Sequence, residues 1–356
     1  MEKKASLYDF LPQEYPIPGK AAYRQKQIAE WLYQKRVDTF EAMSNLPGEL
    51  RTKLARTYTL LPLKLLKRQG AHDTTQKLLW QLTDGQLIES VLIPASPALY
   101  GEASDRKTLC LSTQVGCAYG CRFCASGLEG WKRNLTPGEI VAQILATEKI
   151  SKQKVNNLVF MGMGEPLANY DNLMKAIEII NAPWGLNLGA RHITISTSGL
   201  APQIKKLADS PKQIRLAISL HGATDEVRSQ IMPVNKKYPL AQLLEACLYY
   251  QKKKRKRITL EFILIQDIND SLDQAQHLAH LCQQLHAKVN LIPYNRVEGL
   301  PWERPSENRV KQFTKTVCAH GAIATVRREK GHDIDAACGQ LRLKTDRELA
   351  SHSLTL

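Results

Sequence analysis

Cys117, Cys121 and Cys124 lie within one short run of the chain, Gly116 to Gly127, with C-x3-C-x2-C spacing. Three thiolates at this spacing can hold three irons of an iron–sulfur cubane and leave the fourth iron without a protein ligand. An iron with an open position can bind and cleave a substrate or cofactor, whereas a cluster with four cysteine ligands normally only transfers electrons. The spacing therefore predicts a catalytic 4Fe–4S cluster.

A zinc site and a disulfide are the two alternatives for these cysteines. Zinc usually takes four nitrogen or sulfur ligands in paired short spacings, and no second C-x2-C or H-x3-H pair occurs elsewhere in the sequence. Disulfides are not expected in a chain with eight cysteines over 356 residues and no secretory signal.

The composition predicts a sizeable folded protein with an anionic partner. A chain of 356 residues with 43% hydrophobic content can bury one large domain and an accessory one. The net charge is +15, the sequence pI is near 9.4, and residues 252–257 are six consecutive cations. Such a field attracts polyphosphate, and it favours a nucleic-acid substrate.

The sequence predicts a cytoplasmic protein without a membrane anchor. The charged first residues are not followed by an apolar stretch, so no signal peptide is expected. The longest apolar runs, such as 158–163 and 262–265, have the length of strands, not of membrane spans.

Residues 1–95 are predicted to form an N-terminal helical accessory domain plus a β-hairpin. Helical periodicity occurs in 23–33 and 39–47. Residues 77–82 and 86–93 are predicted to pair around a turn at Asp84-Gly85, and 94–106 form the junction.

After this junction, short apolar strands alternate with helix-length segments, which predicts an α/β fold with a parallel sheet, open or curled into a barrel. The expected strands are 108–112, 157–161, 192–196, 214–220, 259–265, 288–293 and 323–327, and the expected helices include 136–151, 171–181, 240–253 and 272–285. Thr136-Pro-Gly-Glu139 has the residues of a helix start. Polar or glycine-rich groups follow five of the strands, as on the active face of a (βα) barrel.

Six motifs together resemble the RlmN/Cfr family of radical S-adenosylmethionine RNA methyltransferases, over most of the chain. They are Gly116–Cys124, Arg133–Thr136, Met161–Leu167, Ile195–Gly199, Ala217–His221 and Asp335–Leu341. The resemblance implies a partial (βα)6 radical S-adenosylmethionine barrel over residues 103–333, after the accessory domain. Residues 334–356 are expected to form a C-terminal tail that carries Cys338.

The resemblance also implies the cofactors and their ligands. Cys117, Cys121 and Cys124 would hold the 4Fe–4S cluster, whose open iron chelates S-adenosylmethionine; reductive cleavage gives a 5′-deoxyadenosyl radical. The expected contacts of this cofactor are Gly164, Glu165, Ser196, Ser219, Leu220, His221 and Asn295. From position alone, Glu165 could instead be a charge at a helix N-terminus, and His221 a buried or turn histidine.

Three further residues would handle the methyl group. One S-adenosylmethionine methylates Cys338, and a second supplies the radical that activates this methyl group, so two are used per turnover. C2 of adenine is electron-poor and cannot attack a sulfonium, so the methylene radical must add to the ring. Cys110 matches the resolving thiol that releases the adduct and leaves a disulfide, and Glu89 matches the proton acceptor.

Each of these three has a plain alternative. Cys338 could be a small buried residue, as we expect for Cys247, Cys282 and Cys318, because free cysteine packs as a small hydrophobe. Cys110 could equally be a buried strand residue. Glu89 could face solvent in the two-residue alternation of its strand.

The resulting hypothesis is methylation of C2 of an adenosine in 23S rRNA, at the peptidyl transferase centre, and of adenosine 37 in tRNAs. An electron donor such as flavodoxin is implied. The alternatives are methylation of C8 by a relative in the same family, a radical enzyme or activase that does not act on RNA, and a non-enzymatic RNA-binding protein with a structural metal site. The C2 assignment depends on Gly164–Leu167 and Ser196–Gly199.

Overall fold

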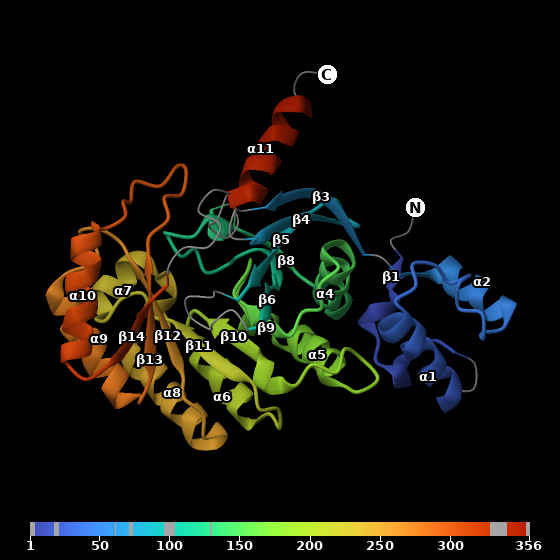
Figure 1. The fold of residues 1–356 in the computed structure, drawn as a ribbon, viewed down its shortest axis with the longest axis horizontal. Coiled ribbons are helices and arrows are strands. Elements are labelled where there is room, and N and C mark those ends of the chain that lie inside the picture. The colour runs from blue at the N-terminus through green and yellow to red at the C-terminus, as the bar shows by residue number, and fades with distance from the viewer. Residues whose placement is uncertain are drawn as a thin grey trace.

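The computed structural model describes residues 4–17, 21–60, 62–70, 74–95, 104–128, 130–327 and 340–353. In this part of the chain, ten strands form one sheet in the order β14-β13-β12-β11-β10-β9-β6-β5-β4-β3 (Figure 1). Their bounds are β3 (Leu63–Gly70), β4 (Gln76–Leu82), β5 (Leu87–Pro94), β6 (Lys107–Cys110), β9 (Asn157–Phe160), β10 (Ile193–Thr197), β11 (Arg215–Ser219), β12 (Thr259–Leu264), β13 (Lys288–Pro293) and β14 (Ile323–Val326).

The part of the sheet from β6 to β14 is parallel throughout. Within the described residues, six strand–helix units precede β14, and the predicted α/β fold is confirmed. The covering helices are α4 (Pro137–Ser151), α5 (Tyr170–Asn181), α6 (Ala201–Asp209), α7 (Asp225–Ile231), α8 (Leu240–Lys254), α9 (Leu272–Gln284) and α10 (Glu307–Ala319). β14 and β3 are the two edges of this sheet, so its strands do not close into a complete barrel.

The parallel strands form because both of their faces are covered. Leu216, Leu260, Phe262 and Leu291 are almost completely buried. Such strands have near-continuous apolar runs. The predicted start of α4 is also confirmed: the Thr136 hydroxyl accepts a hydrogen bond from the Glu139 backbone N–H, in a capping box with Pro137 in the first turn.

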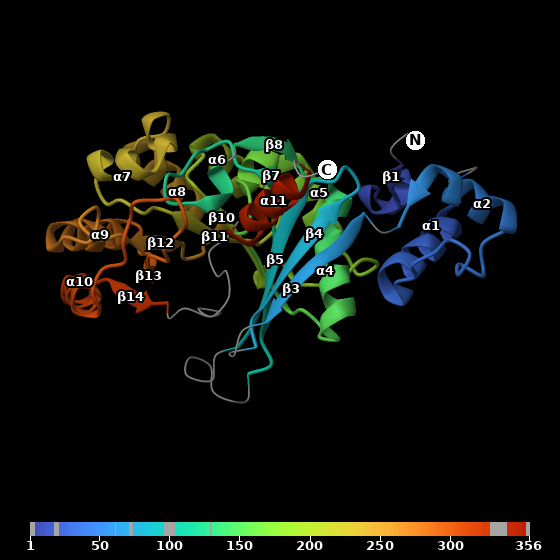
Figure 2. The same cartoon turned by 90° about the horizontal axis from the view of Figure 1, so that it is seen from above.

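The predicted hairpin is present as β4 and β5, which turn at Gly85 with a positive φ of 81°. The prediction grouped it with the N-terminal module, but β5 pairs with β6, so the hairpin extends the main sheet. A third antiparallel strand, β3, follows β4 at the edge and was not predicted. Figure 2 shows these three long strands side by side.

The N-terminal module packs beside α4 and α5 (Figure 1). It contains β1 (Ala5–Ser6), η1 (Leu7–Asp9), η2 (Pro12–Glu14), α1 (Ala22–Ala29), η4 (Glu30–Lys35), α2 (Gly48–Thr57) and β2 (Tyr58–Thr59). The prediction of a helix over 39–47 was wrong: these residues form bends and turns, and the helix begins at Gly48. Pro47 explains this boundary, because a proline disfavours the helical conformation of the residue before it.

The remaining short elements include those around the cysteines and the strand ends. They are β7 (Gln114–Gly116), β8 (Trp131–Asn134), η5 (Ala125–Gly127), η6 (Pro166–Asn169), η7 (Ala190–His192), η8 (Pro233–Lys236) and α11 (Gln340–Ser353). Within the described residues, none of the helices has both the length and the apolar character that a membrane crossing requires.

Polar and aromatic contacts both hold the module on the main body. The Gly138 backbone N–H, in the first turn of α4, donates to the Asp9 carboxylate at 2.8 Å. Lys175 of α5 pairs with Glu14 at 2.6 Å, and the Tyr33 ring contacts the Trp184 ring with centroids 5.7 Å apart. A Cβ added at Gly138 would lie 2.7 Å from Asp9 Oδ1 and 3.1 Å from the Asp9 backbone nitrogen, so Asp9 would have to move away from this junction.

We therefore expect Gly138→Ala to weaken the attachment of the module. Forcing a methyl group into this contact should lower the free energy of unfolding by about 1–3 kcal/mol and speed proteolysis between the module and the main body. Denaturant unfolding and limited proteolysis measure the two effects. Gly48→Ala is the matched control, because its added Cβ would meet only Arg51 Nη2, at 3.9 Å. Equal behaviour of the two variants would contradict this account of the junction.

Candidate active site

The predicted polar segments meet at one edge of the sheet, because parallel strands end on the same side. Residues 162–166 follow β9, 196–199 end β10, 219–222 end β11, and 293–295 end β13. Arg228 of α7 links two of these segments through hydrogen bonds. Its buried guanidinium donates to the carbonyls of Ser198, at 2.5 Å, and Leu220, at 3.0 Å. The sequence analysis did not identify Arg228.

The three cysteines lie in the loop between β7 and η5, beside this edge. The Cys117 backbone N–H donates to the Gly130 carbonyl at 3.0 Å, and the Cys124 N–H donates to the Cys121 carbonyl at 3.0 Å. Gly116 has a φ of 73°, and an added Cβ would lie 1.9 Å from the Gly130 carbonyl oxygen. The loop can therefore fold back over β8 only with glycine at this position.

The chemistry of the three thiols fits an iron–sulfur cluster. The pKa of Cys117 is raised to about 12, mainly by burial, with smaller contributions from the Cys124 thiol and the Glu165 carboxylate. Burial likewise raises the pKa of Cys121 and of Cys124. Three neighbouring, partly buried thiols resist becoming thiolates until a cationic group neutralises them, and iron would supply that charge. Among the described residues, no three His, Cys, Asp or Glu side chains converge on a single metal ion.

Gly164 and Glu165 are fixed against the cysteine loop by Gln114 of β7. The Glu165 backbone N–H donates to Gln114 Oε1 at 2.8 Å. Gly164 has a φ of 95°, and an added Cβ would lie 2.5 Å from the Gln114 Cβ. The buried Glu165 carboxylate accepts hydrogen bonds from the N–H groups of Leu167, at 2.9 Å, and Ser198, at 2.6 Å. Glu165 thus joins the ends of β9 and β10, and Gln114 is a second residue that the sequence analysis missed.

Ser196 and Ser219 lie together at the ends of β10 and β11, with their hydroxyl oxygens 3.3 Å apart. Leu220 is buried, and its N–H donates to the Glu261 carbonyl at 3.0 Å. Asn295 is half-buried after β13. The structure therefore brings the predicted cofactor residues of four strands to one edge.

His221 contacts the cysteine loop directly, since its ring meets that of Phe123 edge-on with centroids 4.8 Å apart. Its Nδ1 accepts a hydrogen bond from the Ile263 N–H at 3.0 Å. Burial, together with the charge of Arg228, lowers the pKa of His221 to about 3. The ring is therefore neutral at physiological pH, and its Nε2–H can donate a hydrogen bond but the ring does not serve as an acid.

Glu261 of β12 also faces this interior, and the sequence analysis did not identify it. It pairs in register with Ser219 on one side and Asn290 on the other. Glu261 is buried, and its Oε1 accepts a hydrogen bond from the Asn290 amide at 2.9 Å, while Oε2 lies 3.9 Å from Arg327 Nη1. Burial raises the pKa of Glu261, and Arg327 opposes the shift.

Glu89 and Cys110 lie on one face of the sheet, at its β5–β6 junction. Cys110 pairs with Val91, two residues after Glu89 on the same face of β5. Glu89 is only 2% exposed, so it does not face solvent. Its Oε2 lies 3.1 Å from Nζ of the equally buried Lys77, which the sequence analysis missed. Burial raises the pKa of Cys110 to about 11, although Arg327 and Lys77 oppose the shift.

Cys338 lies outside the described residues, and the remaining cysteines differ from one another. Cys247 and Cys282 are buried, as predicted, but the prediction for Cys318 was wrong, because it is exposed on the face of α10 that borders a groove. Cys110 is a free thiol, and the described residues contain no disulfide bond.

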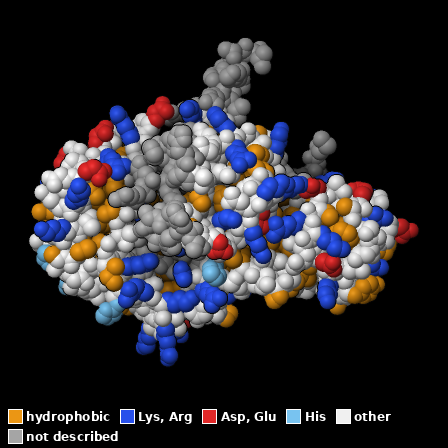
Figure 3. Space-filling model, viewed as in Figure 1, with side chains coloured by type: hydrophobic (Ala, Val, Ile, Leu, Met, Phe, Trp, Pro, Cys, Tyr) orange, Lys and Arg blue, Asp and Glu red, His pale blue; other side chains and the backbone are white. Residues whose placement is uncertain are grey.

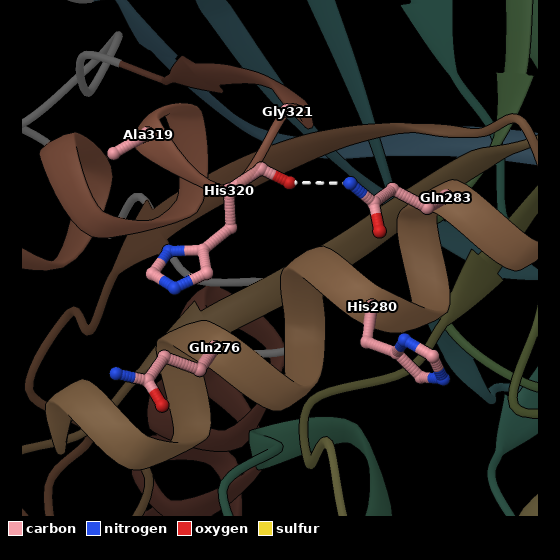
Figure 4. A pocket seen from close by; sticks show the side chains of 6 residues that line it. All are labelled: Gln276, His280, Gln283, Ala319, His320 and Gly321. Carbon is pink, nitrogen blue, oxygen red and sulfur yellow. Dashed lines mark hydrogen bonds between the residues drawn. The ribbon is translucent and has the colours of Figure 1, made fainter.

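Two hollows lie outside the strand-end site. A pocket of ≈ 480 Å³ between α9 and the end of α10 is lined by Gln276, His280, Gln283 and His320, among others (Figure 4). The Gln283 side-chain amide donates a hydrogen bond to the His320 carbonyl at 2.6 Å, at the end of α10 and near the start of β14. This pocket therefore lies away from the strand-end site. A groove of ≈ 640 Å³ runs between α10 and the ends of β13 and β14, and its lining includes Arg304, Lys311, Lys315 and Arg327.

The run of six cations lies at the opposite edge of the sheet from the site. It ends α8 and leads into the start of β12. Lys256 donates to the Gln213 carbonyl at 2.5 Å, Lys254 donates to the Ser210 carbonyl, and Lys253 pairs with Asp209 at 3.3 Å. Three of these six side chains therefore hold the segment before β11 in place.

Comparison with known proteins agrees with this geometry. The model of the radical SAM superfamily matches residues 111–279, and that of the ribosomal RNA large subunit methyltransferase N-terminal domain matches residues 4–60. The probable dual-specificity RNA methyltransferase RlmN of Akkermansia muciniphila is 58% identical over 93% of this chain and 92% of its own length. The protein of the same name from Geobacillus kaustophilus is 47% identical over 96% of this chain and 92% of its own.

A solved structure leads to the same family. The crystal structure of a radical SAM methyltransferase from Sphaerobacter thermophilus has a TM-score of 0.87 and 42% identity, and covers 94% of this chain and 98% of its own. The predicted radical SAM barrel is therefore confirmed, and this chain belongs to the RlmN family of radical SAM RNA methyltransferases.

Proposed function

We propose that this chain methylates C2 of an adenosine in 23S rRNA, at the peptidyl transferase centre, and of adenosine 37 in tRNAs. The observation that carries the proposal is the meeting of the three thiols, the Glu165 loop and the Glu89–Cys110 face around one end of the barrel. Cys124 raises the pKa of both Cys117 and Cys121, and Glu89 raises the pKa of Cys124. The relatives' description as dual-specificity RNA methyltransferases supports both the reaction and the two kinds of RNA.

Cys117, Cys121 and Cys124 would hold the 4Fe–4S cluster, and the strand-end residues would hold S-adenosylmethionine. The bound groups supply one methyl donor and one carbon radical, so two S-adenosylmethionine molecules are used per turnover. Gly164 and Glu165, which Gln114 fixes beside the cysteine loop, would bind the amino-acid end of this cofactor. Ser196, Ser219, Leu220, His221 and Asn295 offer hydroxyl, backbone, imidazole and amide groups for the rest of the cofactor.

Cys338 would carry the methyl group, and Glu89 and Cys110 would complete the reaction. Once the methylene radical has bonded to C2, Glu89 would accept the proton that leaves the ring, and one electron would pass to the cluster, which leaves an even-electron thioether adduct. The Cys110 thiolate would then attack the Cys338 sulfur and the carbon–sulfur bond would break. The released carbon would take up a proton and become the methyl group, and the two sulfurs would form a disulfide that a reductant must reopen. Lys77 and Arg327 favour the thiolate that this attack needs, because both cations lower the pKa of Cys110.

The alternatives fit these observations less well. An activase that does not act on RNA leaves the N-terminal module unexplained, although this module matches a ribosomal RNA methyltransferase domain. A non-enzymatic RNA-binding protein does not require three neighbouring, partly buried thiols near Glu165. The C8 reaction is disfavoured by the relatives, which carry the RlmN name throughout.

RNA would be held by distributed positive charge and not by the run of six cations. Lys and Arg side chains are spread over the main body and the N-terminal module (Figure 3). The groove between α10 and β14 opens at the strand-end edge, and its cations can bind phosphate there. An acidic electron donor such as flavodoxin would reduce the cluster, and the proposed substrates place the reaction in the cytoplasm.

Without this gene, one adenosine of 23S rRNA and adenosine 37 of the tRNAs should each lack one methyl group. An ordinary methyltransferase cannot supply these groups, because C2 of adenine cannot attack a sulfonium directly. Mass spectrometry of digested RNA checks this. The unaltered chain should restore the modification, whereas Cys121→Ala should not, and the purified variant should lack the four irons because two thiolates cannot hold the cluster. An unchanged RNA mass, or full iron content in Cys121→Ala, would contradict the proposal.

Cys110→Ala should trap a covalent protein–RNA adduct. Without the resolving thiol, Cys338 can still be methylated and its methylene can still bond to the base, but the carbon–sulfur bond cannot break. A denaturing gel of the variant expressed with its native RNA should show a shifted band that nuclease removes. The band should be absent from Cys110→Ala, Cys338→Ala. Normal turnover without an adduct would assign the resolving role to another residue.

Lys311→Gln, Lys315→Gln should weaken RNA binding and flatten its dependence on salt by about one unit of slope for each lost phosphate contact. Both lysines are exposed and line the groove. Lys252→Gln, Arg257→Gln removes the same charge from the opposite edge of the sheet and is the matched control. Filter binding across a salt series measures both slopes, and an effect confined to the control pair would place the RNA on the other edge.

A further inference from the structure

The first turn of α11 is attached directly to Glu89. The Arg342 backbone N–H donates to Glu89 Oε1 at 2.7 Å, while Glu89 Oε2 pairs with Lys77 Nζ at 3.1 Å. One buried carboxylate therefore bridges a hairpin lysine and a helix start that are distant in the sequence.

Three features make this contact a defined junction. The first backbone N–H groups of a helix have no acceptor within the helix, and a carboxylate at that end is favoured by the helix dipole. Leu341 is buried in a small cluster with Leu79 and Leu87 of the hairpin. The Gln340 amide donates to the Arg296 carbonyl at 2.8 Å, next to Asn295. The rest of α11 points away from the body, so this end makes its attachment (Figure 1).

The register of the hairpin explains how Lys77 reaches Glu89. Lys77 is paired with Val91, and Glu89 is paired with Leu79, so the two charged residues are diagonal neighbours on one face. Both side chains are almost fully buried, at 1% and 2% exposure. A buried carboxylate needs such a partner to remain charged and in place.

We propose that Lys77 is a positioning residue that holds Glu89 against α11, so that the same carboxylate anchors the chain segment following Cys338. This inference rests on the proposed function, in which Glu89 accepts a proton and Cys338 carries the methyl group. Cys338 is two residues before the start of α11 in the sequence. Fixing that start would hold the segment that follows the methyl-carrying cysteine against the Glu89–Cys110 face.

Hydrogen exchange at the Arg342 amide in the cluster-loaded enzyme tests the anchor independently of activity. Glu89→Ala should speed this exchange about tenfold, the effect of losing one hydrogen bond to a charged group. Glu89→Gln keeps an acceptor oxygen and should retain most of the protection while RNA methylation is lost. Lys77→Met should also speed the exchange and reduce the methylated fraction of Cys338, measured by mass spectrometry of the intact protein. Lys77→Arg should restore both.

Two controls make the result decisive. Lys175→Met breaks the ion pair with Glu14, far from α11, and should change neither measurement. If Lys77→Met does not fold, Lys77→Met, Glu89→Gln removes both charges and should keep Arg342 protection near that of Glu89→Gln. Unchanged Arg342 exchange in Glu89→Ala would overturn the anchor, and unchanged exchange with full Cys338 methylation in Lys77→Met would overturn the role of Lys77. Absence of methyl-Cys338 from the unaltered enzyme would instead overturn the proposed function, and the exchange data would still decide the anchor.

Discussion

The carboxyl ends of the parallel strands lie at one edge of the sheet, and every contact of the candidate site depends on this constraint. Once the strands are in register, the polar segments that follow β9, β10, β11 and β13 must lie close together. Glu165 and Arg228 then fix the positions of these segments, because each forms hydrogen bonds with backbone groups of more than one segment. Gln114 adds the cysteine loop to the same network.

The parts of the molecule that could be predicted from the sequence are those with a local signal. The apolar strands alternate with helices, Thr136 and Glu139 mark the start of α4, and Asp84-Gly85 marks a turn; all three are confirmed. The region 39–47 was misassigned because its periodicity is short and Pro47 decides the boundary. Cys318 was misassigned because helical position alone does not say which face is covered.

The charged residues inside the sheet could not be predicted, since their partners come from distant segments. Lys77, Glu261 and Arg228 have no unusual sequence context, and each is buried among groups that are close only in the folded chain. The partners of the run of six cations could not be predicted either. The run is conspicuous in the sequence, and three of its lysines contact backbone or carboxylate groups next to β11. Local charge density therefore does not show which of these side chains have partners within the protein.

The N-terminal module shares a continuous apolar core with the main body, from Leu7 and Tyr8 through Ile140 to the sheet. Asp9 and the Tyr33–Trp184 contact fix its orientation on α4 and α5. The module is therefore a rigid extension of the catalytic body and not a flexibly tethered domain. If this module binds part of a folded RNA, the proposed reaction would reach only an adenosine that lies at the matching distance from that part. Two RNAs of unrelated sequence could then both be substrates, provided that their folds share this distance.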